Sequence, residues 1–320
     1  MSETTKADVK LLAPDKFRDP NTTADGQPRA EVALGALATL WINTGTLCNL
    51  TCSHCYIESS PKNDRLAYIT AAEVAAYLDE LDQGAWGAAQ IGFTGGEPFM
   101  NPAFMAMLAD ALGRGYEALV LTNAMRPMMK CADELLRLRE RHGARLTLRV
   151  SVDHYSPALH EIERGQGTWR PALYGLCWLS ENGFRVHVAG RSLWGEAEES
   201  LRAGYARLFA AHAIPIDASD PAELVLFPEM DAELDVPEIS ESCWATLGVS
   251  PDQMMCATSR MIIKRKGAAR PAVVACTLLP YEAEFELGGT LADSRRVVKL
   301  NHPHCARFCV LGGGSCSKPD

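Results

Sequence analysis

The sequence lacks any apolar stretch long enough to cross a membrane. Its longest such run extends from about Val32 to Ile42, whereas a membrane-spanning helix needs roughly 18 residues or more. The polar start MSETTKADVK also lacks the basic and apolar regions of a secretory signal peptide. We therefore expect a cytoplasmic protein that has no membrane partner.

An excess of basic charge is also absent. Lys and Arg number 31 against 40 for Asp and Glu, so the net charge of the 320-residue chain is −9. Nucleic-acid-binding proteins usually carry a basic footprint, so we expect no nucleic-acid partner. Hydrophobic residues make up 47% and charged residues 22% of the chain. This balance is typical of a globular chain with one large domain and at most a small appendix.

Cysteine is abundant. The chain has eleven cysteines, which is unusual for a sequence without an export signal. Disulfides are rare in a reducing compartment, so clustered cysteines favour metal ligation or catalysis. One group has three members and another has five: Cys48, Cys52 and Cys55; Cys256, Cys276, Cys305, Cys309 and Cys316. The isolated Cys131 and Cys177 are interpreted as small buried hydrophobic residues.

Strand and helix patterns alternate through the middle of the chain. From Thr39 onward, six short β-branched runs alternate with stretches of helical periodicity, and the last run is AELVLF. Such alternation with short connections is typical of parallel strands joined by right-handed crossovers. It predicts an α/β fold in which a barrel, or part of one, spans residues 35–228.

The two ends of the chain differ from this middle part. Residues 1–34 are polar and interrupted by prolines and a glycine, so we expect a tail or loose cap. Residues 229–320 contain several prolines, a run of glycines and the larger cysteine group. This composition predicts a small, irregular, cysteine-rich C-terminal domain whose folding depends on a bound metal.

The smaller cysteine group directly follows the first predicted strand, in the pattern Cys48-x3-Cys52-x2-Cys55. Parallel α/β folds place their active sites at this edge of the sheet, and three thiolates there suit an iron–sulfur cluster with one iron left open. A zinc site is the alternative and would recruit His54 as its fourth ligand. At the end of the second predicted strand, Gly95-Gly96-Glu97-Pro98 allows the backbone to approach a small ligand.

Together these two motifs resemble the radical S-adenosylmethionine (radical SAM) superfamily, and the resemblance covers about residues 36–228. It implies a partial (β/α)6 TIM-like barrel in which the three cysteines hold a [4Fe–4S] cluster. The open iron would be chelated by S-adenosylmethionine, with Gly95, Gly96 and Glu97 along its methionine amino end. The other cofactor-binding residues implied are His54, near the adenine, and Asn123, Ser151 and Arg191 at later strand ends. From the residues alone, Asn123 is equally typical of a turn and Arg191 of a surface salt bridge.

The larger cysteine group accompanies a predicted β-hairpin. Cys256 precedes the apolar run MIIK, and a second run, PAVVA, ends at Cys276. This order resembles the auxiliary-cluster domains of the same superfamily, called SPASM or, in the shorter form, twitch, and implies a second [4Fe–4S] cluster. The ligands favoured are Cys256, Cys276, Cys309 and Cys316, with Cys305 as the competing member. A zinc ribbon is the alternative for these cysteines.

The resemblance implies an enzyme that reductively cleaves S-adenosylmethionine to a 5′-deoxyadenosyl radical, which abstracts hydrogen from a substrate. Four cysteine ligands at the second cluster favour an electron-transfer role, and hence oxidation, dehydrogenation or cross-linking of a small molecule or peptide. The short polar start leaves no room for a peptide-binding domain, which favours a small molecule. Substrate contacts are then expected from His187, Trp194, Glu229 and Asp231.

Two further expectations concern partners and the competing class of function. The resemblance implies a low-potential electron donor of the flavodoxin or ferredoxin type. Lys264-Arg265-Lys266 is either a docking site for such an acidic donor or a solvated turn. An iron–sulfur or zinc-stabilised binding module without radical chemistry is the alternative to an enzyme.

Overall fold

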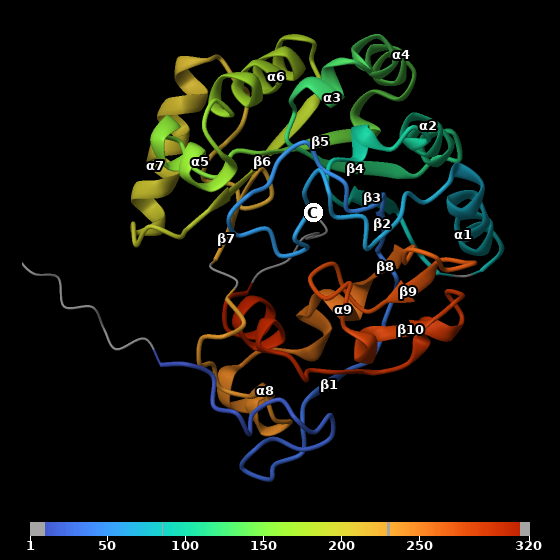
Figure 1. Ribbon diagram of the computed structural model, residues 1–320, viewed down its shortest axis with the longest axis vertical. Coiled ribbons are helices and arrows are strands. Elements are labelled where there is room, and N and C mark those ends of the chain that lie inside the picture. Colours follow the sequence, from blue (N-terminus) through green and yellow to red (C-terminus); the bar gives the residue numbers. More distant parts are fainter. Residues whose placement is uncertain (1–9, 85, 229–230, 314–320) are drawn as a thin grey trace, which may run out of the picture.

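The computed structural model describes residues 10–84, 86–228 and 231–313. Its centre is a nine-stranded sheet with the strand order β10-β9-β8-β2-β3-β4-β5-β6-β7. The six expected strands are consecutive and parallel in this sheet: β2 (Thr39–Asn43), β3 (Gln90–Thr94), β4 (Glu117–Thr122), β5 (Leu146–Ser151), β6 (Arg185–Arg191) and β7 (Leu224–Phe227). Figure 1 shows the curved arrangement of a partial barrel, so the expected α/β fold class is confirmed.

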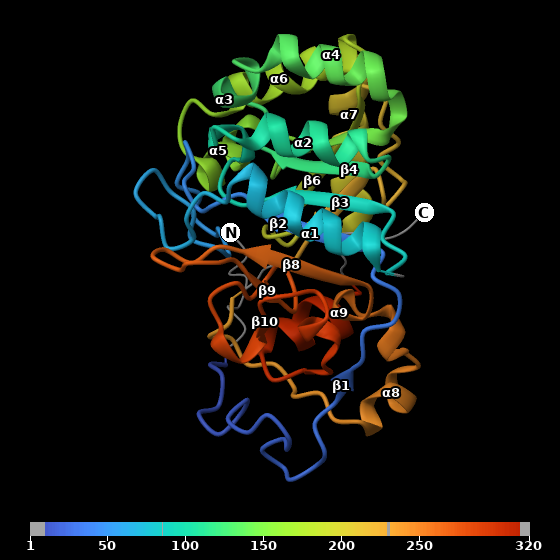
Figure 2. The ribbon, with the colours of Figure 1, turned by 90° about the vertical axis from the view of Figure 1, so that its right-hand side faces the viewer.

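Helices connect successive strands and cover the outer face of the sheet (Figures 1 and 2). They are α1 (Ala71–Gln83), α2 (Phe104–Gly113), α3 (Arg126–Met129), α4 (Ala132–His142), α5 (Pro157–Arg164), α6 (Trp169–Glu181) and α7 (Glu198–Ala211). α1 begins after Thr70 because the Thr70 hydroxyl accepts a hydrogen bond from the Glu73 N–H, while the Glu73 carboxylate accepts one from the Thr70 N–H. Within the described ranges, no helix has both the length and the apolar character of a membrane span.

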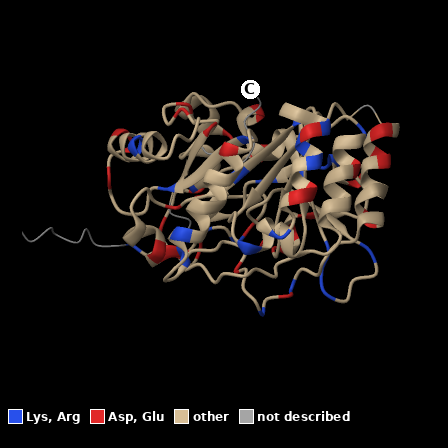
Figure 3. Cartoon of the chain, turned by 90° about the horizontal axis from the view of Figure 1, so that it is seen from above, with Lys and Arg blue, Asp and Glu red and all other residues tan. Residues whose placement is uncertain are grey.

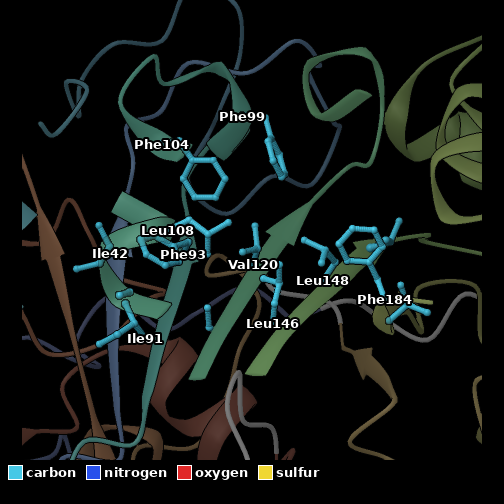
Figure 4. Close-up of a cluster of buried hydrophobic side chains, with 14 of the residues drawn as sticks. Ile42, Ile91, Phe93, Phe99, Phe104, Leu108, Val120, Leu146, Leu148 and Phe184 are labelled. Atoms are coloured by element: carbon cyan, nitrogen blue, oxygen red, sulfur yellow. The ribbon is translucent and has the colours of Figure 1, made fainter. Parts of the chain in front are cut away.

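The main core lies between the outer helices and one face of the parallel strands. Alternate side chains of a strand share a face, so Ile91 and Phe93 of β3 join Phe104 and Leu108 of α2 in one buried cluster (Figure 4). Phe93 and Phe104 meet edge to face, with ring centroids 5.4 Å apart. Each large apolar side chain buried here contributes about 1.5–3 kcal/mol relative to exposure. The barrel wall is therefore a rigid base for the residues at the strand ends.

The predicted C-terminal hairpin is confirmed. β8 (Ser259–Ile263) and β9 (Ala272–Val274) pair antiparallel, and β10 (Glu286–Gly288) pairs with β9. β8 also pairs in parallel with β2, with Leu40 opposite Arg260. This unpredicted pairing continues the sheet past residue 228, where a domain boundary was expected. The shorter C-terminal elements are α8 (Ser242–Leu247), α9 (Met255–Thr258), β11 (Val298–Lys299) and a π-helical turn at Cys305–Val310.

Residues 10–34 follow an ordered course instead of forming the loose cap that their composition suggests. β1 (Glu31–Val32) pairs antiparallel with β11, and the buried Arg29 forms an ion pair with Glu238 at 2.6 Å. The blue N-terminal segment accordingly lies beside the orange and red C-terminal segment in both Figure 1 and Figure 2. Glu238 is 209 residues away along the chain, and local proline and glycine content carries no information on contacts at that separation.

Charged residues of both signs are interspersed over the outer helices and the loops (Figure 3). A few charged side chains are buried instead, among them Arg29, Glu97, Arg149, Asp153 and Arg260. Burying a charge costs several kcal/mol unless hydrogen bonds and an opposite charge compensate it. These residues therefore mark the places where the fold depends on specific polar contacts.

Candidate functional site

The three N-terminal cysteines open onto one cavity at the carboxyl ends of the parallel strands. Their loop follows β2 and is held by hydrogen bonds from Gly96 N to Gly45 O (2.8 Å) and from Cys48 N to Ser60 O (3.1 Å). This cysteine cavity is lined by loop, strand-end and helix residues: Cys48, Cys52, Cys55, Tyr56, Ile57, Ser59, Thr94, Gly95, Gly96, Leu121, Thr122, Asn123, Ser151, Arg164 and Arg191. It brings the thiols together with every predicted cofactor-binding residue except His54 and Glu97.

Gly95 and Gly96 let the end of β3 pass close to the cysteine loop. Gly95 has a φ of +134°, a conformation that other residues rarely adopt. A Cβ on Gly96 would lie 2.3 Å from the Leu47 carbonyl oxygen, well inside van der Waals contact. The approach of two backbone segments therefore requires these glycines, and their contact with a cofactor stays a prediction.

Burial controls the protonation of the thiols. It raises the pKa of Cys48 to about 12, and Glu97 and the two other cysteines act in the same direction. Burial also raises the pKa of Cys52, while the Arg164 guanidinium opposes that rise. Metal ligation needs thiolates, so a metal that binds here must displace protons.

Two backbone N–H groups point at the sulfur atoms. Leu50 N donates to Cys48 Sγ (3.4 Å) and Ser59 N donates to Cys55 Sγ (3.3 Å). Such bonds stabilise thiolates and tune the potentials of iron–sulfur clusters. Three thiols along one cavity wall fit a cluster with one open iron, because each ligated iron takes its own thiolate. Over the described ranges, no three Cys, His, Asp or Glu side chains converge as the ligands of a single ion would.

Asp153 holds two arginines at the cysteine cavity. Its Oδ2 lies 2.6 Å from Arg164 Nε, and its Oδ1 lies 3.6 Å from Arg191 Nε. Burial disfavours the charged form of Arg164, but the negative charge of the Asp153 carboxylate is the largest opposing influence and the Arg164 pKa is raised overall. No sequence motif singles out Arg164, because a basic residue in the last turn of a helix is common.

Glu97 lies behind the cavity wall. Its buried carboxylate accepts hydrogen bonds from Thr122 Oγ1 and Asn123 N, both at 2.9 Å. Burial raises the pKa of Glu97 to about 7, and these hydrogen bonds act in the opposite direction. Asn123 Nδ2 in turn donates to Asn49 Oδ1 (2.9 Å). Glu97 therefore fixes the end of β4 and, through Asn123, the cysteine loop.

His54 turns its ring toward α5. Its Nδ1 lies 2.6 Å from Glu163 Oε2, and 53% of its side chain is exposed. Its backbone carbonyl accepts a hydrogen bond from Arg191 Nη2 (2.8 Å). Tyr56, on the other side of Cys55, lines the cavity instead. Contact between His54 and an adenine stays a prediction.

A second cavity adjoins the first. It shares five lining residues with the cysteine cavity: Tyr56, Leu121, Ser151, Arg164 and Arg191. Its other walls come from β5, β6, the end of β7 and the C-terminal segment: Arg149, Asp153, Ala189, Gly190, Phe227 and Leu278. The second cavity thus has apolar and charged side chains in its walls and lies beside the thiols. Ligand sites in proteins usually combine such walls, so this cavity is the candidate substrate site.

Three of the four residues predicted to contact a substrate line neither cavity. His187 is buried on β6, and Trp194 packs edge to face against His154 with ring centroids 4.9 Å apart. Neither of them, nor Asp231, lines either cavity, and Glu229 falls outside the described residues. Arg149 and Phe227, which do line the second cavity, follow no motif that would single them out in the sequence.

Four cysteines of the larger group share one region of the C-terminal segment. Cys256 and Cys305 are buried, while Cys276 and Cys309 are half-buried. Burial raises the pKa of Cys305, and the charges of the three others raise it further. Burial raises the pKa of Cys256 to about 11. Cys305, expected as a competing ligand, therefore lies with these three, and Cys316 falls outside the described residues.

The three cations beside the hairpin turn are each paired within the chain. Lys264 meets Glu73 at 2.6 Å, Arg265 meets Glu286 at 2.8 Å and Lys266 meets Asp64 at 2.5 Å. Their charge is balanced locally. The two isolated cysteines, Cys131 and Cys177, pack against the main core but are half-buried instead of fully buried as expected.

A protein-family model described as the radical SAM superfamily matches residues 42–196. These residues are a radical SAM domain. The domain contains the cysteine cavity's three thiols and runs from the end of β2 to the loop after β6. Radical SAM proteins use a [4Fe–4S] cluster and S-adenosylmethionine, so the resemblance drawn from the two motifs is confirmed for this domain. The likeness of the C-terminal segment to SPASM or twitch domains stays a prediction.

Two curated bacterial proteins are similar to parts of this chain. The antilisterial bacteriocin subtilosin biosynthesis protein AlbA of Bacillus subtilis (strain 168) is 29% identical over 143 residues, which cover 44% of this chain and 30% of AlbA. The AdoMet-dependent heme synthase of Oleidesulfovibrio alaskensis is 25% identical over 170 residues, which cover 53% of this chain and 40% of the synthase. The chain thus spans less than half the length of either relative.

Solved radical SAM structures share the fold. SuiB of Streptococcus suis bound to S-adenosylmethionine is similar with a TM-score of 0.56 and 12% identity, over 79% of this chain and 63% of SuiB. The enzyme anSMEcpe with bound AdoMet is similar with a TM-score of 0.56 and 14% identity, over 80% of this chain and 79% of that chain. At these identities the likeness concerns the fold alone.

Proposed function

We propose that the protein is a radical SAM enzyme in which Cys48, Cys52 and Cys55 hold a [4Fe–4S] cluster and S-adenosylmethionine occupies the cysteine cavity. One observation carries this proposal. The three thiols face the same cavity as the ends of four consecutive parallel strands, which supply Gly95, Asn123, Ser151 and Arg191.

When bound, the cluster and S-adenosylmethionine supply a 5′-deoxyadenosyl radical that abstracts hydrogen from a substrate. Arg164 and Arg191 place positive charge at the cavity, where a carboxylate of S-adenosylmethionine finds charge-assisted hydrogen bonds. The buried Asp153 carboxylate lies beside both guanidinium groups and helps to orient them. Phe227 and Leu278 of the second cavity exclude water from the space beside the thiols.

The substrate is a peptide or a small molecule, and the reaction is an oxidation, dehydrogenation or cross-linking. A peptide is supported by the likeness to AlbA, a bacteriocin biosynthesis protein, and to SuiB, which has been solved with its precursor peptide SuiA at a TM-score of 0.57. A small molecule is supported by the likeness to a heme synthase. The electron donor in this proposal is a low-potential protein of the flavodoxin or ferredoxin type.

The second part of the proposal concerns the C-terminal cysteines. They hold an auxiliary [4Fe–4S] cluster, with Cys256, Cys276 and Cys309 as ligands and either Cys305 or Cys316 as the fourth. The burial and mutual influence of four of these thiols support it. Clustered thiolates that share one site are the usual ligands of such clusters.

The test is anaerobic reconstitution followed by iron analysis and an assay for 5′-deoxyadenosine in the presence of dithionite. Wild type is expected to hold roughly eight irons, and the triple variant Cys48→Ala, Cys52→Ala, Cys55→Ala about four and no cleavage activity. A double variant, Cys131→Ala and Cys177→Ala, is the matched control and is expected to behave like wild type. Zinc in place of iron, or iron without cleavage, would instead favour a metal-stabilised binding module.

A further inference from the structure

Arg260 is a cation that the fold buries completely. It lies on β8, between β9 and β2 in the sheet, and its side chain is not exposed to solvent. Its N–H groups donate to backbone carbonyls: Nη1 to Cys256 O (2.6 Å) and Ser259 O (2.8 Å), Nε to Ser294 O (3.0 Å) and Nη2 to Arg296 O (3.5 Å). The guanidinium is thus well hydrogen-bonded, but these partners carry no formal charge.

Arg29, which is also fully buried, has a charged partner. Arg29 is compensated by the Glu238 carboxylate at 2.6 Å. For Arg260, no residue in the described part of the chain supplies a carboxylate in an ion pair. A buried charge without an opposite charge costs several kcal/mol, so a second source of negative charge is expected beside Arg260.

The neighbours of Arg260 identify that source. Its guanidinium touches the backbone of Cys256, and β9, which pairs with β8, leads directly to Cys276. Burial lowers the pKa of Arg260 to about 10, and negative charge on these two cysteines would oppose that fall. As protonated thiols they are neutral, whereas as ligands of a metal centre they are thiolates.

We propose that Arg260 is the counter-ion of an anionic metal–thiolate centre that includes Cys256 and Cys276, and that its fixed positive charge raises the reduction potential of that centre. The inference rests on the proposed auxiliary cluster. A positive charge near a cluster favours the reduced form, because reduction adds one negative charge. Arg260 is a positioning and electrostatic residue in this role and does not ligate metal.

The experiment uses the full-length chain in the Cys48→Ala, Cys52→Ala, Cys55→Ala background, so that any remaining cluster is the C-terminal one. Arg260→Met removes the charge, Arg260→Lys keeps it, and Arg29→Met is the matched control for loss of a buried arginine. Iron and sulfide content are measured first, and the midpoint potential is then measured by an anaerobic titration that follows the electron paramagnetic resonance signal. Arg260→Met is expected to disfavour reduction about tenfold, a fall of about 59 mV for one electron, while Arg260→Lys and Arg29→Met stay near the parent.

The outcomes separate the two proposals. Absence of an iron–sulfur cluster from the parent background would overturn the auxiliary cluster, and the role of Arg260 with it. A complete cluster whose potential is the same in Arg260→Met and Arg29→Met would overturn the role of Arg260 alone. If Arg260→Met fails to fold, Arg260→Gln retains donors for the carbonyl groups and gives the same comparison without the charge.

Discussion

Replacement of Asp153 by Asn removes the carboxylate that compensates two guanidinium groups at the cysteine cavity. Arg164 and Arg191 lie 2.6 Å and 3.6 Å from its oxygens, and Asp153 is 2% exposed. Removal of one partner from a buried ion pair costs about 3–5 kcal/mol, because the other charge remains buried without compensation. In a chain of this length the expected fall in Tm is about 4–8 °C.

The matched control is Asp64→Asn, which breaks the exposed pair between Asp64 and Lys266. An exposed pair contributes at most about 1 kcal/mol, so the control is expected to unfold close to wild type. Calorimetry of the metal-free proteins measures both effects. In the reconstituted proteins, calorimetric titration with S-adenosylmethionine is expected to show about tenfold weaker binding for Asp153→Asn, equivalent to about 1.4 kcal/mol, because the Arg164 guanidinium loses its ion pair with Asp153.

Equal unfolding temperatures for the Asp153 and Asp64 variants would refute the stabilising role assigned to the buried carboxylate. Unchanged binding of S-adenosylmethionine, with the loss of stability present, would show that the two arginines do not need Asp153 to serve the cofactor. The two readouts therefore test the packing argument and the site argument separately.

Three further predictions concern backbone approach, pH and the N-terminal segment. Gly96→Ala places a Cβ 2.3 Å from the Leu47 carbonyl oxygen and is expected to cost about 1–3 kcal/mol in urea unfolding and to lower iron retention. Gly113→Ala is the control: Gly113 is the last residue of α2 and no atom lies near its Cβ, so the free energy of unfolding should change by less than about 0.5 kcal/mol. Burial raises the pKa of Glu97 from 4.5 to about 7, so the folded state binds this proton more tightly than the unfolded state does. The free energy of unfolding is therefore expected to be highest below the unfolded pKa of 4.5 and to fall by about 3 kcal/mol in total as pH rises through about 7. Glu97→Gln should flatten this pH dependence, and an unchanged slope would contradict the prediction. Glu238→Gln leaves Arg29 buried without an opposite charge and is expected to lower the free energy of unfolding by about 3–5 kcal/mol. Proteolysis within residues 10–34 should then be faster than in wild type. Equal cleavage rates would show that the ion pair between Arg29 and Glu238 does not hold this segment.

Local patterns predicted the barrel well because each strand and helix carries its own signal. The β-branched runs from Thr39 to Phe227 became strands in the expected order, and the hairpin from β8 to β9 formed around its predicted turn. The parallel pairing of β8 with β2 was not predictable in the same way. Both strands are buried along their whole length and apolar at their centres, and such strands pair equally well with many neighbours.

In the candidate site too, local features could be predicted from the sequence and contacts between separate elements could not. The spacing of Cys48, Cys52 and Cys55 sufficed to predict thiols on one loop, because the residues that form the loop are contiguous. The opposite orientations of His54 and Tyr56 could not be predicted, since they depend on where Glu163 of α5 lies in space. Arg164 was missed for the same reason: its importance arises from Asp153, which precedes α5 at the end of a different element.

The pairing of β8 with β2 has a consequence for any attempt to divide this chain. Every residue of β2 is buried, and its two backbone edges are taken by β3 and β8. A fragment that ends near residue 228 would therefore expose a row of unpaired N–H and C=O groups along an apolar strand, which is a template for aggregation. The strand that leads into the cysteine loop needs residues more than 200 positions further along the chain for its second edge, so a soluble barrel fragment is not expected without them.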